Sequence, residues 1–373
     1  MNKKENKIAI IANIVPKYRE GFYEKILKNK KFKIKIFCQK SLPTPIETSH
    51  TKFKKNVKLL NYFSFGNEKI VITKLPIIHL IRNYDLFVVE GNPRYISHFI
   101  FATMLILLRK KVILWTMAHS SANNKFREYV RLKWTKLFKY LYVYTDLEKI
   151  FLKKKGFNNH VIYPMNNGLN LEEIDKIKKN FYKNNQNRKN LTFLSCSRLL
   201  KKNRFDLAIN AFAKLKENYK FKFKYILIGT GDQDKYLKSL VKDYGLQNYV
   251  EFKGKIYDEK KLAPYFMKSV CLIHPSSIGL SLIHAFSYGL PVITHSSKLL
   301  HNPEIAAFKN NYTGFFFKIN DVNSLKNKIK KFFENKNLKN IFRLNCYNIV
   351  KNKYNSFYMA KNFFKLVDQL NKG

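Results

Sequence analysis

The sequence predicts an α/β protein built from two doubly wound parallel sheets. Near-continuous apolar runs, typical of strands covered on both faces, alternate with one-sided helical patterns between residues 7 and 144. The chain turns polar and basic over residues 175–190, and the alternation restarts at residue 191. We therefore expect domains at residues 1–174 and 191–345, a linker at 175–190 and a helical tail at 346–373.

In the first half, the isoleucine-rich run at residues 7–14 is the first expected strand, and Pro16 ends it. Further expected strands are 32–38, 86–90, 111–116 and 141–144, with helices at 18–27, 96–108 and 127–138. Open α/β sheets bind ligands outside the carboxyl ends of their strands. The segments 13–19, 90–94 and 119–121 are therefore candidate binding loops.

The second half repeats this order, with expected strands at 191–196, 223–228 and 249–252 and helices at 205–215 and 234–244. The segment 274–294 reads HPSSIGLSLIHAFSYGLPVIT, which predicts the end of a strand, a loop, a short helix, a turn and another strand. Free backbone N–H groups at the start of that helix suit a phosphate. An ordinary β-α-β unit without a ligand is the alternative interpretation.

The composition indicates a globular protein, because 46% of its 373 residues are hydrophobic. The net charge of +46 attracts phosphates, nucleic acid or anionic lipid, but it is scattered in runs of lysine and asparagine. Four isolated cysteines are interpreted as buried thiols in a reducing compartment. The start lacks a signal peptide pattern and the apolar run 96–108 is too short to span a bilayer, so we expect a cytoplasmic protein.

Several ordered motifs carry a resemblance to a known family. They are Ser197-Arg198-Leu199, Gly229-Thr230-Gly231, the segment 250–254, and Gly289-Leu290-Pro291-Val292. Over residues 191–317 this series resembles the donor-binding half of the retaining glycosyltransferases with the GT-B fold, family four. The resemblance implies two Rossmann-like domains facing across a cleft, with a nucleotide-sugar in the C-terminal domain and an acceptor in the N-terminal one. It also implies that the tail at 346–373 crosses back to the first domain.

The resemblance assigns Arg198 to the donor diphosphate, whose charge grows as the glycosidic bond breaks and suits a guanidinium. The family usually has a lysine where this chain has Asn203, and the flanking Lys202 and Arg204 are the candidates to supply that charge. The backbone of Gly279 and Leu280 completes the expected diphosphate site.

Two glutamates of the family are replaced in this chain. The first, near the transferred sugar, falls at Ser276, and the second, which holds ribose hydroxyls, falls at His284. We expect these two residues, with Ser281, Gly229 and Gly231, to contact the nucleotide and its ribose. A histidine packed in the core is the competing interpretation of His284.

Two residues are expected at the reacting centre. His119 follows an expected strand and corresponds to a histidine near the reacting centre in related enzymes, and Glu304 matches a Pro-Glu pair of the family. Arg19, Asn92 and Arg94 lie at other strand ends and are the candidates for the acceptor side, with ion pairing between domains as the alternative for the arginines.

The resemblance implies a metal-independent glycosyltransferase, without a cofactor, that moves a sugar with retention from a nucleotide-sugar to a polysaccharide or lipid-linked glycan. Assembly of surface polysaccharide, lipopolysaccharide or capsule is the expected context. Asp232-Gln233-Asp234 spells the D-x-D of metal-dependent transferases, but it falls where a helix begins and carboxylates act as caps. The helical segment 125–142 mixes basic and apolar residues, so one face suits the anionic inner surface of a membrane, with burial on the sheet as the alternative.

Two other functions compete with this one. A sugar-nucleotide epimerase of similar architecture would consume its nucleotide-sugar without an acceptor. A nucleic-acid-binding protein is suggested by charge alone, but the sequence has no basic patch with interleaved aromatic residues and no known nucleic-acid module, so we expect no nucleic-acid partner.

Overall fold

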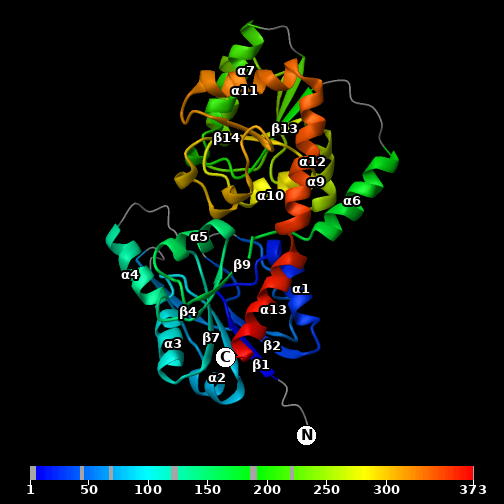
Figure 1. Ribbon diagram of the computed structural model, residues 1–373. Helices are drawn as coiled ribbons and strands as arrows, with labels where there is room; N and C mark the ends of the chain where they lie inside the picture. Colours follow the sequence, from blue (N-terminus) through cyan, green and yellow to red (C-terminus); the bar gives the residue numbers. More distant parts are fainter. Residues whose placement is uncertain are drawn as a thin grey trace. The chain divides into compact units, whose positions relative to one another are not determined.

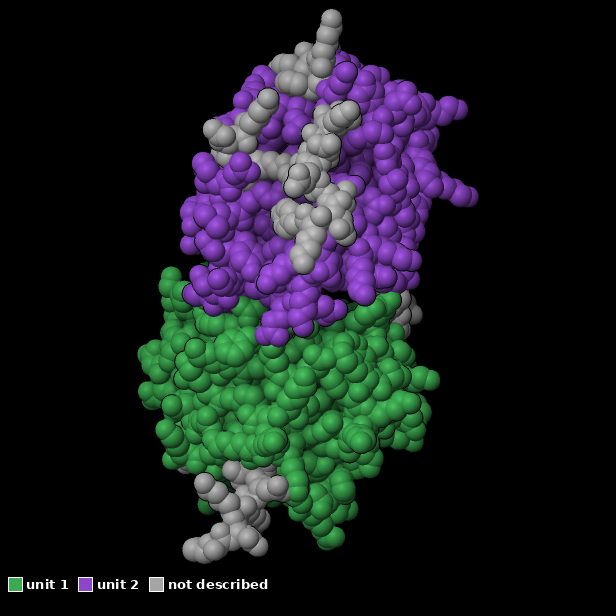
Figure 2. Space-filling view, turned by 90° about the vertical axis from the view of Figure 1, so that its right-hand side faces the viewer, with its two compact units in different colours: residues 1–170, 355–373 green, residues 171–354 purple. Residues whose placement is uncertain are grey.

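The computed structural model of the chain describes residues 6–42, 46–66, 70–118, 125–184, 191–218 and 222–372. The chain divides into two compact units, shown as ribbons in Figure 1 and as coloured surfaces in Figure 2. Unit 1 comprises residues 1–170 and 355–373, and unit 2 comprises residues 171–354. Each unit is a parallel sheet covered by helices on both faces, so the predicted pair of Rossmann-like folds is confirmed.

Unit 1 contains a seven-stranded parallel sheet in the order β3-β2-β1-β6-β7-β8-β9. Its strands are β1 (Asn6–Ile11), β2 (Phe32–Cys38), β3 (Val57–Leu59), β6 (Leu86–Glu90), β7 (Lys111–Thr116), β8 (Tyr140–Val143) and β9 (Val161–Pro164). The direction of winding reverses between β1 and β6, so the loops after these two strands diverge and leave room for a ligand.

The two faces of this sheet bury separate cores, and β1 shows why its sequence is apolar throughout. Ile8 and Ile10 face one core, whereas Ala9 and Ile11 face the other, because successive side chains of a strand point to opposite faces. The first core is covered by α1 (Glu20–Leu27) and α13 (Ser356–Lys372), which lie side by side in Figure 1. Helices on the second are α2 (Ile77–Asn83), α3 (Ile96–Leu107), α4 (Lys125–Thr135) and α5 (Asp146–Lys154).

A small antiparallel hairpin of β4 (Tyr62–Phe65) and β5 (Ile70–Thr73) interrupts the alternation in unit 1. Phe63 pairs with Ile72 and Phe65 with Ile70, and all four side chains are exposed. Val71, on the opposite face of the hairpin, is buried beside α3. The hairpin thus carries an apolar outer face.

Unit 2 contains a six-stranded parallel sheet in the order β12-β11-β10-β13-β14-β15. Its strands are β10 (Leu191–Cys196), β11 (Phe223–Ile228), β12 (Val250–Phe252), β13 (Cys271–His274), β14 (Val292–His295) and β15 (Gly314–Phe317). The winding reverses between β10 and β13, which places a binding position outside the carboxyl ends of those strands.

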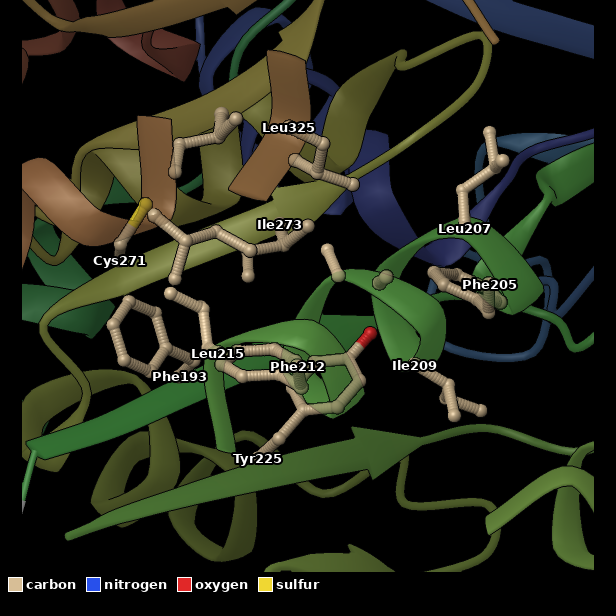
Figure 3. Close-up of a cluster of buried hydrophobic side chains, with 14 of the residues drawn as sticks. Phe193, Phe205, Leu207, Ile209, Phe212, Leu215, Tyr225, Cys271, Ile273 and Leu325 are labelled. Carbon is tan, nitrogen blue, oxygen red and sulfur yellow. The ribbon is translucent and has the colours of Figure 1, made fainter. Parts of the chain in front are cut away.

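The core of unit 2 is rich in aromatic side chains from both strands and helices (Figure 3). Phe212 stacks on Phe223 at a centroid distance of 4.9 Å and lies 4.7 Å from Tyr225. The helices of this unit are α6 (Leu171–Asn184), α7 (Phe205–Asn218), α8 (Asp234–Asp243), α9 (Glu259–Lys268), α10 (Leu280–Ser287), α11 (Val322–Glu334) and α12 (Lys336–Lys353).

The boundaries of the units differ from those expected. Residues 175–184 of the expected linker continue helix α6, and the rest of that linker lies outside the described residues. Asp175 of α6 accepts hydrogen bonds from Tyr347 at 2.6 Å and from Lys178 at 3.0 Å, which fixes the helix within unit 2. Helix α12 also belongs to unit 2, so the chain returns to unit 1 at residue 355 rather than at 346.

No helix among the described residues combines the length and the apolar character that crossing a bilayer requires.

Replacing Phe363 of α13 with alanine should destabilise the protein by about 3–5 kcal/mol, because removal of this fully buried ring leaves a cavity. The ring of Phe363 contacts Phe22 and Tyr142 edge to face, at centroid distances of 5.9 and 6.0 Å. Phe357→Ala on the same helix is the control, since that side chain is 62% exposed and should change stability by less than about 0.5 kcal/mol. Urea unfolding measures both variants, and equal losses would contradict the packing of α13.

Candidate functional site

The candidate site of unit 2 begins with two loops that pair through their backbones. At the carboxyl end of β10, Ser197 N–H donates to Ile228 O and Leu199 N–H donates to Thr230 O, both at 3.0 Å. The loop after β11 thereby supports the loop that carries Arg198.

Gly229 and Gly231 make this pairing sterically feasible. A Cβ on Gly229, whose φ is 141°, would lie 1.9 Å from Ser197 O, and one on Gly231 would lie 2.2 Å from Leu199 O. Both glycines were predicted to contact the nucleotide, and that contact stays a prediction. The structure shows that they allow the two loops to approach each other. Asp234, the first residue of α8, accepts a hydrogen bond from Gly231 N–H at 3.4 Å, so its carboxylate supports the loop before the helix rather than capping the helix.

The three predicted diphosphate cations have different environments. The side chains of Arg198 and Lys202 are exposed, and the structure gives them no side-chain partner in the part of the chain that it describes. Arg204, in a left-handed conformation at φ 52°, is instead engaged by Asp206 at 3.0 Å and by Asn320 at 3.0 Å. Arg198 and Lys202 are therefore available to an anion, whereas the guanidinium of Arg204 is held by Asp206 and Asn320.

Asn203 holds the Arg198 loop in place. Its side chain is buried and its amide donates to Arg198 O at 2.6 Å and to Ser197 Oγ at 3.3 Å. The residue that replaces the family's lysine therefore has a structural role, which the substitution alone did not reveal.

The start of α10 presents the second part of the site. Its N-cap, Gly279, offers no side chain to the first helical turn, so backbone N–H groups there are open to a ligand. A Cβ on Gly279 would lie 2.7 Å from Asn302 Nδ2, so a larger residue here would require the exposed Asn302 side chain to move. Ser276 and Ser281 lie half-buried on either side of Gly279.

Three histidines, His274, His295 and His301, make hydrogen bonds to the backbone of the loops around α10. His301 Nδ1 accepts from Ile278 N–H at 3.0 Å, so its Nε2 carries the proton and donates to His295 O at 2.9 Å. The rings of His295 and His301 stack at a centroid distance of 3.9 Å. Burial lowers the pKa of His274 and of His295 to about 4 and also lowers the pKa of His301. The folded protein thus favours the neutral form of these three imidazoles.

His284 points into the protein, toward helix α9. Its Nε2 lies 2.8 Å from Glu259 Oε1, and Tyr288 donates to the same oxygen at 2.5 Å. The sequence did not single out Glu259, although its place just after Asp258, the N-cap of α9 beyond β12, was a usable signal.

Glu304, predicted at the reacting centre, is buried in a 3-10 helix, η4 (Pro303–Ala307), that packs on α10. His119 lies outside the described residues. Ala118, directly before it, donates to Glu148 at 2.9 Å, so the end of that segment is anchored to α5.

In unit 1, Arg19 is buried at the carboxyl ends of the strands. Its guanidinium lies over the rings of Trp115 and Tyr144 at 4.8 and 5.3 Å and its Nε donates to Asn167 at 3.4 Å. Asn92 is half-buried, whereas Arg94 is exposed. The structure thus places Arg19 within the packing of unit 1 and leaves Arg94 at its surface.

Comparison with known proteins shows which family the second unit resembles. Residues 176–348 match the family model described as "Glycosyl transferases group 1". A relative from Methanocaldococcus jannaschii, named an uncharacterized glycosyltransferase, is 25% identical over 330 residues, which cover 77% of this chain and 81% of the relative.

Two solved structures share the fold over nearly their whole length. A glycosyltransferase from Rickettsia africae has a TM-score of 0.71 at 17% identity, covering 99% of this chain and 100% of its own. The Anabaena protein HepE, solved in complex with UDP, has a TM-score of 0.70 at 15% identity, with 98% and 100% covered. Unit 2 thus resembles the glycosyl transferases group 1 over most of its length, and the shared fold confirms the predicted GT-B architecture.

Acidification should destabilise the protein as pH falls from about 6.5 to about 4. In that range the histidines of the unfolded chain bind protons, whereas the buried ones do not. A fully buried imidazole such as His274 therefore lowers the free energy of unfolding by about 1.4 kcal/mol for each pH unit of acidification. Above that range the stabilisation is fully present. Urea unfolding at several pH values should show a shallower pH dependence for His274→Gln than for the wild type, and an equal slope would contradict this role.

Proposed function

We propose that the protein transfers a sugar, with retention and without a metal, from a nucleotide-sugar to a polysaccharide or lipid-linked glycan in surface polysaccharide, lipopolysaccharide or capsule assembly. Unit 2 binds the donor and unit 1 the acceptor. The observation that carries the proposal is the pair of exposed cations, Arg198 and Lys202, on a braced loop of the unit that matches the family.

The chemistry of the leaving group fits these residues. A nucleoside diphosphate gains negative charge as the glycosidic bond breaks, and a guanidinium fork stabilises that charge by paired hydrogen bonds. The open N–H groups at the start of α10 add the positive end of a helix dipole. These groups supply positive charge without a metal, and the complex of HepE with UDP supports a nucleoside diphosphate as the ligand.

A lipid-linked acceptor is supported by the surface of unit 1. Phe126 of α4 is 74% exposed, and Tyr129 and Val130 are exposed beside it, whereas Trp134 is buried against Phe99 of α3 at a centroid distance of 4.2 Å. Only part of the apolar face of α4 is therefore used for packing. Neighbouring α3 exposes apolar residues too, as does the β4–β5 hairpin that packs on it.

This surface combines apolar and basic groups. Lys133 lies 5.5 Å from the ring of Tyr129, and Lys74 lies 4.9 Å from the ring of Phe63 on the hairpin. Exposed apolar side chains of this extent are typical of interaction surfaces, and adjacent lysines favour anionic lipid. We infer that unit 1 rests on the anionic inner face of a membrane.

Arg198→Ala should weaken the binding of UDP at least tenfold and abolish sugar transfer, because a charge-assisted contact to the diphosphate is lost. Calorimetry measures binding, and product analysis with a lipid-linked acceptor measures transfer. Lys242→Ala, on the exposed face of α8, is the matched control and should behave as the wild type. Full activity of Arg198→Ala would refute the proposal, and conversion of the nucleotide-sugar without an acceptor would indicate an epimerase.

The protein should sediment with phosphatidylglycerol vesicles and leave them at high salt, because lysines contribute to attraction that salt screens. Phe126→Ser should reduce the bound fraction severalfold, since an inserted ring contributes apolar burial. Phe357→Ser, at a similarly exposed ring on α13, is the control. Equal binding to neutral and anionic vesicles would contradict the membrane assignment.

A further inference from the structure

Only one of the two carboxylate oxygens of Glu259 has hydrogen-bond partners among the described residues. Both of its protein donors, His284 Nε2 at 2.8 Å and the Tyr288 hydroxyl at 2.5 Å, bind the same oxygen, Oε1. The structure records no partner for Oε2 among the described residues, and the Glu259 side chain is 28% exposed. One oxygen is therefore fixed and the other is open.

The carboxylate is ionised and its position is fixed. Burial raises the pKa of Glu259, but His284 and Tyr288 lower it more, so the net pKa lies below the ordinary value. Phe266 holds both donors in place, with its ring 4.3 Å from His284 and 5.1 Å from Tyr288. The side chain thus needs little reorganisation to bind a ligand.

The location and charge of Glu259 limit what it can bind. It opens α9 at the end of the loop that follows β12, in the unit whose Arg198 and Lys202 are free for an anion. A carboxylate repels phosphate but accepts hydrogen bonds from neutral hydroxyl groups. Within a nucleoside diphosphate, the vicinal hydroxyls of the ribose are such donors.

We propose that Glu259, oriented by His284 and Tyr288, binds the ribose hydroxyls of the donor nucleotide. The inference rests on the proposed function and deepens it, since it assigns the ribose contact to a residue of α9 rather than to α10. His284 is then a positioning residue that acts through Glu259. A glutamate at position 284 would put a second carboxylate beside Glu259, and the histidine avoids this repulsion.

The test compares nucleoside diphosphates with and without ribose hydroxyls. UDP, GDP and ADP and their 2′,3′-dideoxy forms are titrated into the full-length protein by calorimetry. We expect the wild type to prefer the ribose form of its nucleotide by about tenfold or more, and Glu259→Gln to lose most of that preference. Tyr288→Phe, which removes one donor from Oε1, should lose part of it.

Glu251→Gln is the matched control, since Glu251 also has two partners, Lys224 and Lys253, and its side chain is 31% exposed. It should keep the full preference. Thermal unfolding shows that each variant is folded. Retention of the full preference by folded Glu259→Gln overturns the inference, as does wild-type protein that binds both forms equally, and the proposed function then stands. If the wild type binds none of the diphosphates, both proposals fail.

Discussion

The close approach of two backbone segments, 197–199 and 229–231, is the constraint on which the candidate site depends. Carbonyl oxygens of the first segment occupy the space where side chains of the second would begin. The two loops are joined by hydrogen bonds that continue the pairing of β10 with β11. The loop that carries the exposed Arg198 therefore cannot shift without breaking these bonds. The Asn203 side chain donates a further hydrogen bond to the backbone of Arg198, so an exposed cation is carried by a loop that is held at several points.

The strands of both sheets were largely predictable from the sequence. The bounds of β2, β6, β7, β10 and β11 agree with those expected, because apolar residues dominate these strands, on both faces of the sheet in β6 and on one face in the first half of β2. Helix α6 was missed because lysine and asparagine dominate its sequence and hide the buried Leu171 and Ile174. The β4–β5 hairpin was missed because its apolar residues face outward, which the assumption of a buried apolar face does not anticipate. Helix α5 had an unused signal, the capping box of Thr145 and Glu148.

Local sequence predicted the positions of the candidate loops better than the partners of their side chains. The Gly-rich turns and the start of α10 were expected after the strands of unit 2, and the structure has them at the carboxyl ends of those strands. The partners of His284 could not be predicted, since Glu259 comes from another helix and the pairing depends on how α9 and α10 pack. The same holds for Arg204, whose left-handed backbone turns its side chain toward Asp206. The hydrogen-bond partner of such a side chain is decided by tertiary contacts, which the sequence alone does not give.

The outer face of the β4–β5 hairpin affects how copies of this protein behave toward one another. Phe63, Phe65, Ile70 and Ile72 form a short apolar surface on the hairpin, and exposed apolar side chains of this kind are where copies can associate. A net charge of +46 opposes that contact by long-range repulsion. The excess of lysine and arginine therefore helps to keep copies apart in solution, and this effect weakens as added salt screens the repulsion.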